Sequence, residues 1–180
     1  MALKKVLTIA GSDTSAGAGM QADLKTFQEL DVYGMVALTA IVTMDKATWS
    51  HDVTPLPMDV FEKQLETAIS IGPDAIKTGM LGTEEIIKRA GEVYEQSGAD
   101  YFVVDPVMVC KGEDEVLNPG NTDAMIQYLL PKATVVTPNL FEAGQLSGLG
   151  KLTSIEDMKK AAQIIFDKGA KHVIIKGGKA

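Results

Sequence analysis

The sequence is poor in several features that would point to particular environments or partners. It has one cysteine, Cys110, so no internal disulfide framework is possible, which fits a reducing cytoplasm. Its 24 acidic residues outnumber 17 lysines and arginines, giving a net charge of −7. Such a surface repels nucleic acid and anionic membranes, so we expect neither as a partner. The apolar runs are too short for a membrane span or a signal peptide.

Two common nucleotide-binding motifs are also missing from the glycine-rich loop in VLTIAGSDTSAGAGMQADLKTF. No Gly-Lys-Ser/Thr follows its glycines, so it is not a P-loop. It contains no G-x-G-x-x-G, and no convincing ribose-binding acid follows, which argues against a dinucleotide site. The small residues Ala16–Gly19 would let a ligand approach the backbone closely, and a tight turn into the next helix is the alternative interpretation.

Short apolar runs alternate with amphipathic segments along the chain. This pattern predicts one α/β domain over residues 1–180, with a mainly parallel sheet and helices on both faces. The strand order cannot be obtained from the sequence. The expected strands are Val6–Ala10, Met35–Met44, Ala75–Thr78, Tyr101–Asp105, Thr134–Thr137 and His172–Lys176. The expected helices are Ala18–Leu30, Asp59–Ile71, Glu84–Ser97, Thr122–Leu130, one from about Leu140, and one that opens with a capping box at Thr153–Glu156 and ends at Lys168.

Two of these segments carry predictions about burial. The stretch Met35–Met44 is apolar and β-branched throughout, so we expect it to be buried on both faces. In the helix Asp59–Ile71, the residues expected to face the core are Val60, Phe61, Leu65, Ala68 and Ile69.

Polar residues follow several of the expected strands, where ligands bind in open α/β sheets. Asp105 ends one strand, Asn139 and Glu142 follow another, and Lys176 ends the last. Carboxylates that hold Mg²⁺ and a lysine that neutralises phosphate oxygens would suit a metal–nucleotide. Each residue also has a plainer interpretation. Asp105 suits a turn, Asn139 and Glu142 suit a helix cap, and Lys176 suits a solvated charge.

Five motifs together resemble one family: AGSDTSAGAGMQADLKTFQELDVYG, KTGML, DPVMVCKG, TPNLFEA and IIKGG. The chain resembles the hydroxymethylpyrimidine and phosphomethylpyrimidine kinases of thiamin synthesis, and more closely the branch that phosphorylates pyridoxal and related vitamin B6 forms. The resemblance covers almost the whole chain in order. It implies a ribokinase-like fold, a cytoplasmic homodimer, and ATP-dependent phosphorylation of a hydroxymethyl group on a flat heteroaromatic ring.

The resemblance also assigns roles to residues. The glycine-rich loop would line the ring pocket rather than the phosphates. The substrate-binding positions it implies are Gly11, Ala18, Asp23, Val42, Met44, Met80 and Val107. Pyrimidine kinases of the family commonly carry Gln at position 44, so Met44 favours a ring without the amino group, unless it serves only packing. The nucleotide-side positions it implies are Asn139 and Lys176 for ATP, and Asp105 and Glu142 for Mg²⁺.

Cys110 lies in MVCKGEDEVL, which we interpret as a lid over the ring. The resemblance implies that a cysteine here marks the B6 branch, with its thiol close to the bound aldehyde. The alternative is a small apolar residue without a role.

The chain departs from the resemblance after IIKGGKA. Relatives continue with a GTGC or GAGC stretch that opens a helix and carries the main catalytic residue, which is absent from these 180 residues. We therefore expect part of a longer chain, and negligible kinase activity if these residues were everything. The competing functions are a thiamin-pathway kinase and, in another class, a non-catalytic module that binds a ring or a nucleotide.

Overall fold

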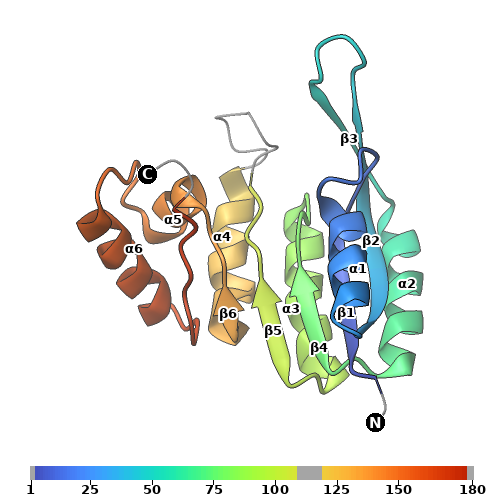
Figure 1. The fold of residues 1–180 in the computed structure, drawn as a ribbon. Helices are drawn as coiled ribbons and strands as arrows, with labels where there is room; N and C mark the ends of the chain where they lie inside the picture. Colours follow the sequence, from blue (N-terminus) through green and yellow to red (C-terminus); the bar gives the residue numbers. More distant parts are fainter. Residues whose placement is uncertain (1–2, 109–118, 178–180) are drawn as a thin grey trace.

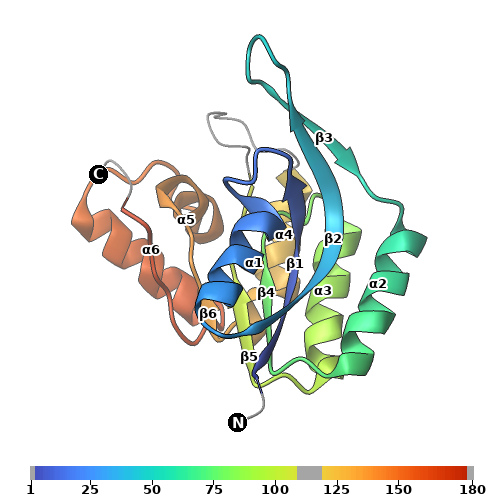
Figure 2. The same cartoon turned by 45° about the vertical axis from the view of Figure 1, so that its right-hand side comes forward.

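A six-stranded sheet forms the centre of the computed structural model, which describes residues 3–108 and 119–177 (Figures 1 and 2). The strand order is β3-β2-β1-β4-β5-β6. Every neighbouring pair is parallel except β2 and β3, so the predicted α/β fold with a mainly parallel sheet is confirmed. The strands are β1 (Lys5–Asp13), β2 (Tyr33–Met44), β3 (His51–Pro55), β4 (Ala75–Thr78), β5 (Tyr101–Val104) and β6 (Val135–Val136).

Helices cover both faces of this sheet, as predicted. The helices are α1 (Gly19–Glu29), α2 (Met58–Ile71), α3 (Glu84–Ser97), α4 (Pro119–Tyr128), α5 (Leu140–Ser147) and α6 (Ile155–Asp167), with a 3₁₀ turn at Leu130–Lys132. Figure 2 shows α1 on one face, with α2, α3 and α4 on the other, while α5 and α6 lie beside β6. The chain leaves β1 in one direction for β2 and later returns to β4 on the other side of β1. Right-handed crossovers then place the connecting helices on opposite faces.

The core consists of apolar side chains between the sheet and these two helical layers. Leu7 and Ile9 of β1 are fully buried, as are Ile76 of β4 and Phe102 and Val104 of β5. Central parallel strands need such side chains because helices cover both of their faces. None of the helices in the described ranges is both long and apolar enough to cross a bilayer.

The end of β2 departs from its predicted burial. Residues 40–44 of β2 pair with β3, and the resulting hairpin extends beyond the rest of the sheet at the top of Figure 1. Ile41 is 40% exposed there, so the prediction that Met35–Met44 is buried on both faces is wrong for this half. The sequence analysis missed β3 because His51–Pro55 mixes polar and apolar residues without a strand-like alternation.

The first half of β2 lies at an edge of the sheet, where a side chain of α2 bonds to its backbone. The carboxamide of Gln64 accepts a hydrogen bond from the Leu38 N–H at 2.8 Å and donates to the Leu38 carbonyl at 3.1 Å. One side chain thus takes the place of a neighbouring strand's peptide group. Val60, on the same helix, is 40% exposed, so its predicted inward position is wrong, whereas Phe61, Leu65 and Ala68 are buried as predicted.

Most other elements differ from their predicted bounds by one to three residues at an end, and three differences stand out. The expected strand His172–Lys176 makes only isolated parallel bridges, Val136 with Val173 and Asn139 with Lys176. The α4 helix begins at Pro119 rather than Thr122 and gives way to the 3₁₀ turn, in which Pro131 lacks the N–H that an α-helix would need. The capping box of α6 joins Ser154 to Asp157 and therefore lies one residue later than predicted. Thr153 precedes this cap.

Close packing behind α5 gives a test of the fold. A Cβ at Gly144 would clash with the Gly150 carbonyl oxygen, and only a shift of the backbone could relieve the clash. We expect Gly144→Ala to lower the free energy of unfolding by about 3 kcal/mol, at the upper end of overpacking costs, measured by urea denaturation. The control Gln145→Ala on the same helix should change it by less than about 0.5 kcal/mol. Equal stability of the two variants would contradict the observed packing.

Candidate active site

Parallel pairing brings the ends of separate strands to one edge of the sheet, and the predicted site residues fall into two groups along that edge. One group follows β5 and β6. The other surrounds the loop between β1 and α1, next to the end of β4. The strand order reverses between β1 and β4, which is where open α/β sheets form their ligand crevice.

The first group centres on Asp105, directly after β5. The Lys176 Nζ lies 2.9 Å from its Oδ1, and the Thr137 hydroxyl donates to the same oxygen at 3.3 Å. The Lys176 N–H donates to the Pro138 carbonyl at 2.8 Å, which fixes the lysine beside the segment that follows β6. The structure therefore joins Asp105 and Lys176, which are 71 residues apart in sequence.

The next pair in this group forms a reciprocal cap at the start of α5. The Glu142 N–H donates to the Asn139 side-chain oxygen at 2.8 Å, and the Asn139 N–H donates to the Glu142 carboxylate at 2.7 Å. The plainer interpretation of Asn139 and Glu142 as a capping box is thus confirmed. A cap alone does not explain why Glu142 is only 3% exposed, because capping carboxylates usually remain in water.

Burial raises the pKa of Glu142 to about 7, and the nearby charge of Asp105 adds to the increase. The N–H groups of Asn139 and Met108 and the charge of Lys176 act in the opposite direction but do not cancel it. A buried carboxyl beside a second carboxylate is a typical functional-site arrangement, and a cation would relieve their repulsion. Across residues 3–108 and 119–177 no three His, Cys, Asp or Glu side chains cluster as a metal site. A metal here would therefore rely on these two carboxylates plus ligand and water oxygens.

The second group lies around the loop from Gly11 to Gly19. A Cβ at Gly11 would lie 3.7 Å from the Met80 sulfur, so the loop packs against the segment that follows β4. The Thr14 N–H and hydroxyl both donate to the Val42 carbonyl, at 3.1 and 2.9 Å. At Gly19, φ is +61°, and a Cβ would lie 2.5 Å from the Gly11 carbonyl oxygen. Only glycine allows the loop to fold back this closely.

Asp13 holds this loop together, a role that the sequence analysis missed. Its carboxylate accepts hydrogen bonds from the N–H groups of Ser15 and Ala18, both at 2.8 Å. Burial alone would raise its pKa, but hydrogen bonds from Ser15, Ala18 and Gly17 outweigh burial and lower the pKa below its usual value. An aspartate two residues before a serine is an Asx-turn signal that could have found this role.

Three further predicted residues make contacts of their own. The Asp23 carboxylate accepts from the Thr8 hydroxyl at 2.6 Å and pairs with Lys77 Nζ at 2.9 Å, which ties α1 to β1 and β4. Met44 pairs with His51 in the projecting hairpin. The Val107 N–H donates to the Asp105 carbonyl at 2.9 Å, so Val107 belongs to the turn after β5. Cys110 lies outside the described residues.

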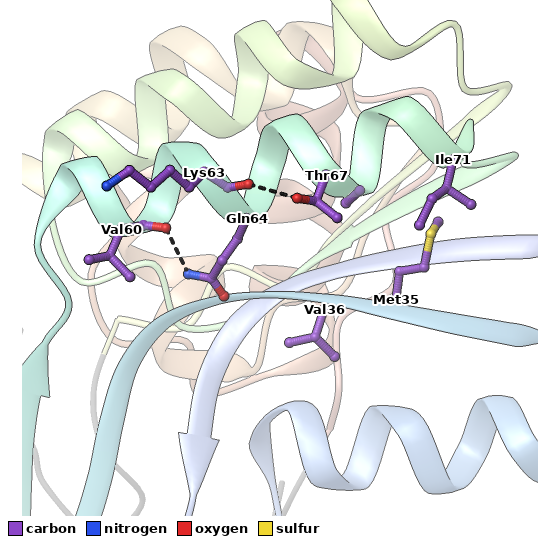
Figure 3. Close-up of a pocket in the computed structure, with 8 residues that line it drawn as sticks. Met35, Val36, Val60, Lys63, Gln64, Thr67 and Ile71 are labelled. Carbon is purple, nitrogen blue, oxygen red and sulfur yellow. Dashed lines mark hydrogen bonds between the residues drawn. The ribbon is translucent and has the colours of Figure 1, made fainter.

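A groove of about 440 Å³ lies elsewhere, between α2 and the first half of β2 (Figure 3). Its lining includes Met35, Val36 and Ile71, and Lys63 is the one charged residue among those that line it. Figure 3 shows the Gln64 carboxamide between this helix and strand. Because the groove lacks the groups that phosphoryl transfer or acid–base chemistry needs, we place the active site at the edge described above.

The order of strands and the helices on both faces place the chain in the ribokinase-like fold class. The phosphomethylpyrimidine kinase model matches residues 13–180, and the chain belongs to this family. This confirms the resemblance found in the motifs.

Individual relatives support the same placement. A pyridoxine kinase of Bacillus subtilis (strain 168) is 53% identical over 99% of this chain and 66% of its own length. The structure of pyridoxal kinase from Staphylococcus aureus in complex with pyridoxal is 90% identical, with a TM-score of 0.96, and the match covers 100% of this chain and 67% of that one. The same enzyme in complex with ADP is 92% identical, with a TM-score of 0.96, over 99% of this chain and 65% of that one. The chain spans 65–66% of the length of such curated relatives.

The buried carboxyl of Glu142 makes stability depend on pH. Its folded pKa of about 7 lies above its ordinary 4.5, so folded protein holds the proton more tightly. The stabilisation from that proton is present below pH 4.5 and is lost as pH rises through 7. We expect the wild type to lose about 3 kcal/mol of unfolding free energy over this range relative to Glu142→Gln, measured by urea denaturation at several pH values. Parallel pH curves for the two proteins would rule out a raised pKa.

Proposed function

We propose that the protein transfers the γ-phosphoryl group of ATP to the hydroxymethyl group of pyridoxal, pyridoxine and pyridoxamine, with hydroxymethylpyrimidine as a second substrate. The observation that carries the proposal is the pairing of two sites on one sheet edge. The loop after β1, which packs near Met80 in the segment after β4, shares this edge with the charged pair Asp105 and Lys176 after β5 and β6. The similarity to the Staphylococcus aureus enzyme supports the assignment, because that enzyme has been solved with pyridoxal and with ADP.

We assign the crevice at β1 and β4 to the ring. Gly11 and Met80 lie in contact there, and Ala18 and Val42 are tied to the same loop by hydrogen bonds. Small and apolar groups suit the face of a flat ring, since close approach needs little side-chain bulk. Asp23, Met44 and Val107 complete the set of residues we propose for this pocket.

We assign the charged group to the triphosphate. Lys176 would exchange its contact with Asp105 for phosphate oxygens, and Asn139 would hold the nucleotide beside it. Asp105 and Glu142 fit Mg²⁺, since burial, with a smaller contribution from the charge of Asp105, raises the pKa of Glu142, and a divalent cation would favour its ionised form. When bound, Mg²⁺ would neutralise charge on the phosphate oxygens. Phosphoryl transfer depends mainly on positioning and charge neutralisation, and these residues supply both.

Two broader features belong to the same proposal. We propose a cytoplasmic enzyme, in keeping with a single cysteine. We also propose a homodimer, supported by Ile41, Val60 and Ile71, which are each 40% exposed on β2 and the neighbouring α2.

The second candidate is a hydroxymethylpyrimidine/phosphomethylpyrimidine kinase of thiamin synthesis, which the family's description favours. Met44 argues for the B6 ring instead. A methionine cannot make the hydrogen bonds by which a Gln at this position would recognise an exocyclic amino group.

Side-by-side turnover separates these candidates. With full-length protein and MgATP, we expect a higher kcat/KM for pyridoxal than for hydroxymethylpyrimidine. Met44→Gln should shift the ratio toward the pyrimidine by roughly tenfold, because it restores hydrogen bonds to the amino group. A wild type that prefers the pyrimidine would establish the second candidate, and phosphorylation of neither compound would refute the proposal.

Lys176 provides a test of the nucleotide side. We expect Lys176→Ala to raise the KM for ATP by roughly 10- to 100-fold, because a charge-assisted contact to phosphate is lost. The control is Lys171→Ala, an exposed lysine five residues earlier whose N–H bond to the Ala133 carbonyl survives the change. Its KM for ATP should stay within about twofold of wild type. An unchanged KM in folded Lys176→Ala would mean that the triphosphate lies elsewhere.

A further inference from the structure

We propose that Asp13 is a positioning residue of the ring pocket, whose carboxylate holds the loop after β1 in the shape that presents Gly11 and Ala18 to the ring. The inference rests on the proposed function, because it concerns the pocket assigned there to the vitamin. Asp13 is not among the residues expected to touch the ring. It acts through the loop.

The carboxylate of Asp13 uses both of its oxygens inside the loop. Its Oδ1 accepts from the Ser15 N–H, and its Oδ2 accepts from the Ala18 N–H, each at 2.8 Å. The Ser15 hydroxyl donates to the same carboxylate, at 2.8 and 3.0 Å to the two oxygens. Asp13 is only 8% exposed, so little water is available to replace these bonds. One side chain therefore fixes both the middle of the loop and the residue that begins α1.

The loop needs such an anchor because its composition does not specify a shape. Ala16 has a φ of +60° and Gly19 has a φ of +61°, both in the left-handed region. Glycine has no side chain and alanine has only a methyl group, so packing does little to hold such a backbone. Hydrogen bonds to Asp13 supply the constraint that packing does not.

Asp13 also links the loop to its surroundings. Its N–H donates to the Gln21 side-chain oxygen at 2.9 Å, and the Gln21 amide donates to the Ser12 hydroxyl at 2.7 Å. The next residue, Thr14, makes its two hydrogen bonds to the carbonyl of Val42. Asp13 and its two neighbours thus connect the end of β1 to the first turn of α1 and to Val42 of β2.

The chemistry requires a carboxylate at this position. The N–H groups of Ser15 and Ala18 approach different oxygens, so both oxygens must accept. In Asp13→Asn the side chain keeps its shape but offers one acceptor and one NH₂ group. The N–H group of either Ser15 or Ala18 then faces the NH₂ group of the asparagine instead of an acceptor, and we expect the loop to shift at that residue.

The test is steady-state kinetics of the full-length Asp13→Asn protein. We expect the KM for pyridoxal to rise by about tenfold or more, because the pocket wall is misplaced. The KM for ATP should change by less than about twofold, since the charged group is held independently. Equilibrium dialysis of pyridoxal without ATP should show a similar loss of affinity.

Asp157→Asn is the matched control. Asp157 also accepts hydrogen bonds at the start of a helix, from the N–H groups of Thr153 and Ser154 and from the Thr153 hydroxyl. Its replacement should lower thermal stability but leave both KM values unchanged. The proposal is overturned if folded Asp13→Asn keeps a wild-type KM for pyridoxal, or if both variants raise it equally.

Milder variants cover the case in which Asp13→Asn does not fold. Ser15→Ala removes only the hydroxyl donor, and Gln21→Leu removes only the support from α1. Each variant should raise the KM for pyridoxal by about threefold. If both variants keep the wild-type KM, the positioning role is overturned.

A failure of the proposed function gives a different result. A wild type that binds pyridoxal without phosphorylating it contradicts the function, and the dialysis comparison still decides the role of Asp13. A wild type with no affinity for pyridoxal contradicts both, because the pocket assignment itself is then wrong.

Discussion

The parallel pairing of β1 with both β2 and β4 is the constraint on which the site depends. Because parallel strands share a direction, their carboxyl ends meet at one edge, and residues far apart in sequence become neighbours there. The contact between Gly11 and Met80 and the ion pair between Asp105 and Lys176 both arise in this way. The strand order also reverses between β1 and β4, which is the position at which open α/β sheets bind their ligands.

The two groups at this edge differ in how their buried carboxyl groups are stabilised, and their pKa values shift in opposite directions. Around β5 and β6, the structure buries a second carboxyl near Asp105, which raises the pKa of Glu142 and lowers stability at neutral pH. Around β1, it uses a buried carboxylate to satisfy backbone donors, which lowers the pKa of Asp13 and stabilises a loop with few packing side chains. The first arrangement leaves a buried carboxyl beside a second carboxylate, whereas the second fixes the backbone of a loop.

The fold was predictable from the sequence wherever burial decided the local structure. The bounds of β4 and α3 were predicted correctly, because covered parallel strands and amphipathic helices leave clear patterns. The hairpin strand β3 and the isolated bridges of residues 172–176 were not, because exposed edges impose no hydrophobic period. The pairing of Asp105 with Lys176 follows from strand ends meeting at one edge. The role of Asp13 depends on the path of a loop, and the spacing of Asp13 and Ser15, which is an Asx-turn signal, was the clue to it in the sequence.

The carboxamide of Gln64 has a consequence for how the molecule behaves among other chains. By bonding to both the N–H and the carbonyl of Leu38, it occupies a stretch of β2 that none of the strands in the described residues covers. An open stretch of this kind is a template on which another polypeptide can add a strand and start aggregation. Gln64 of α2 thus blocks this part of the β2 edge from pairing with another chain, and no longer β3 strand is needed to do so.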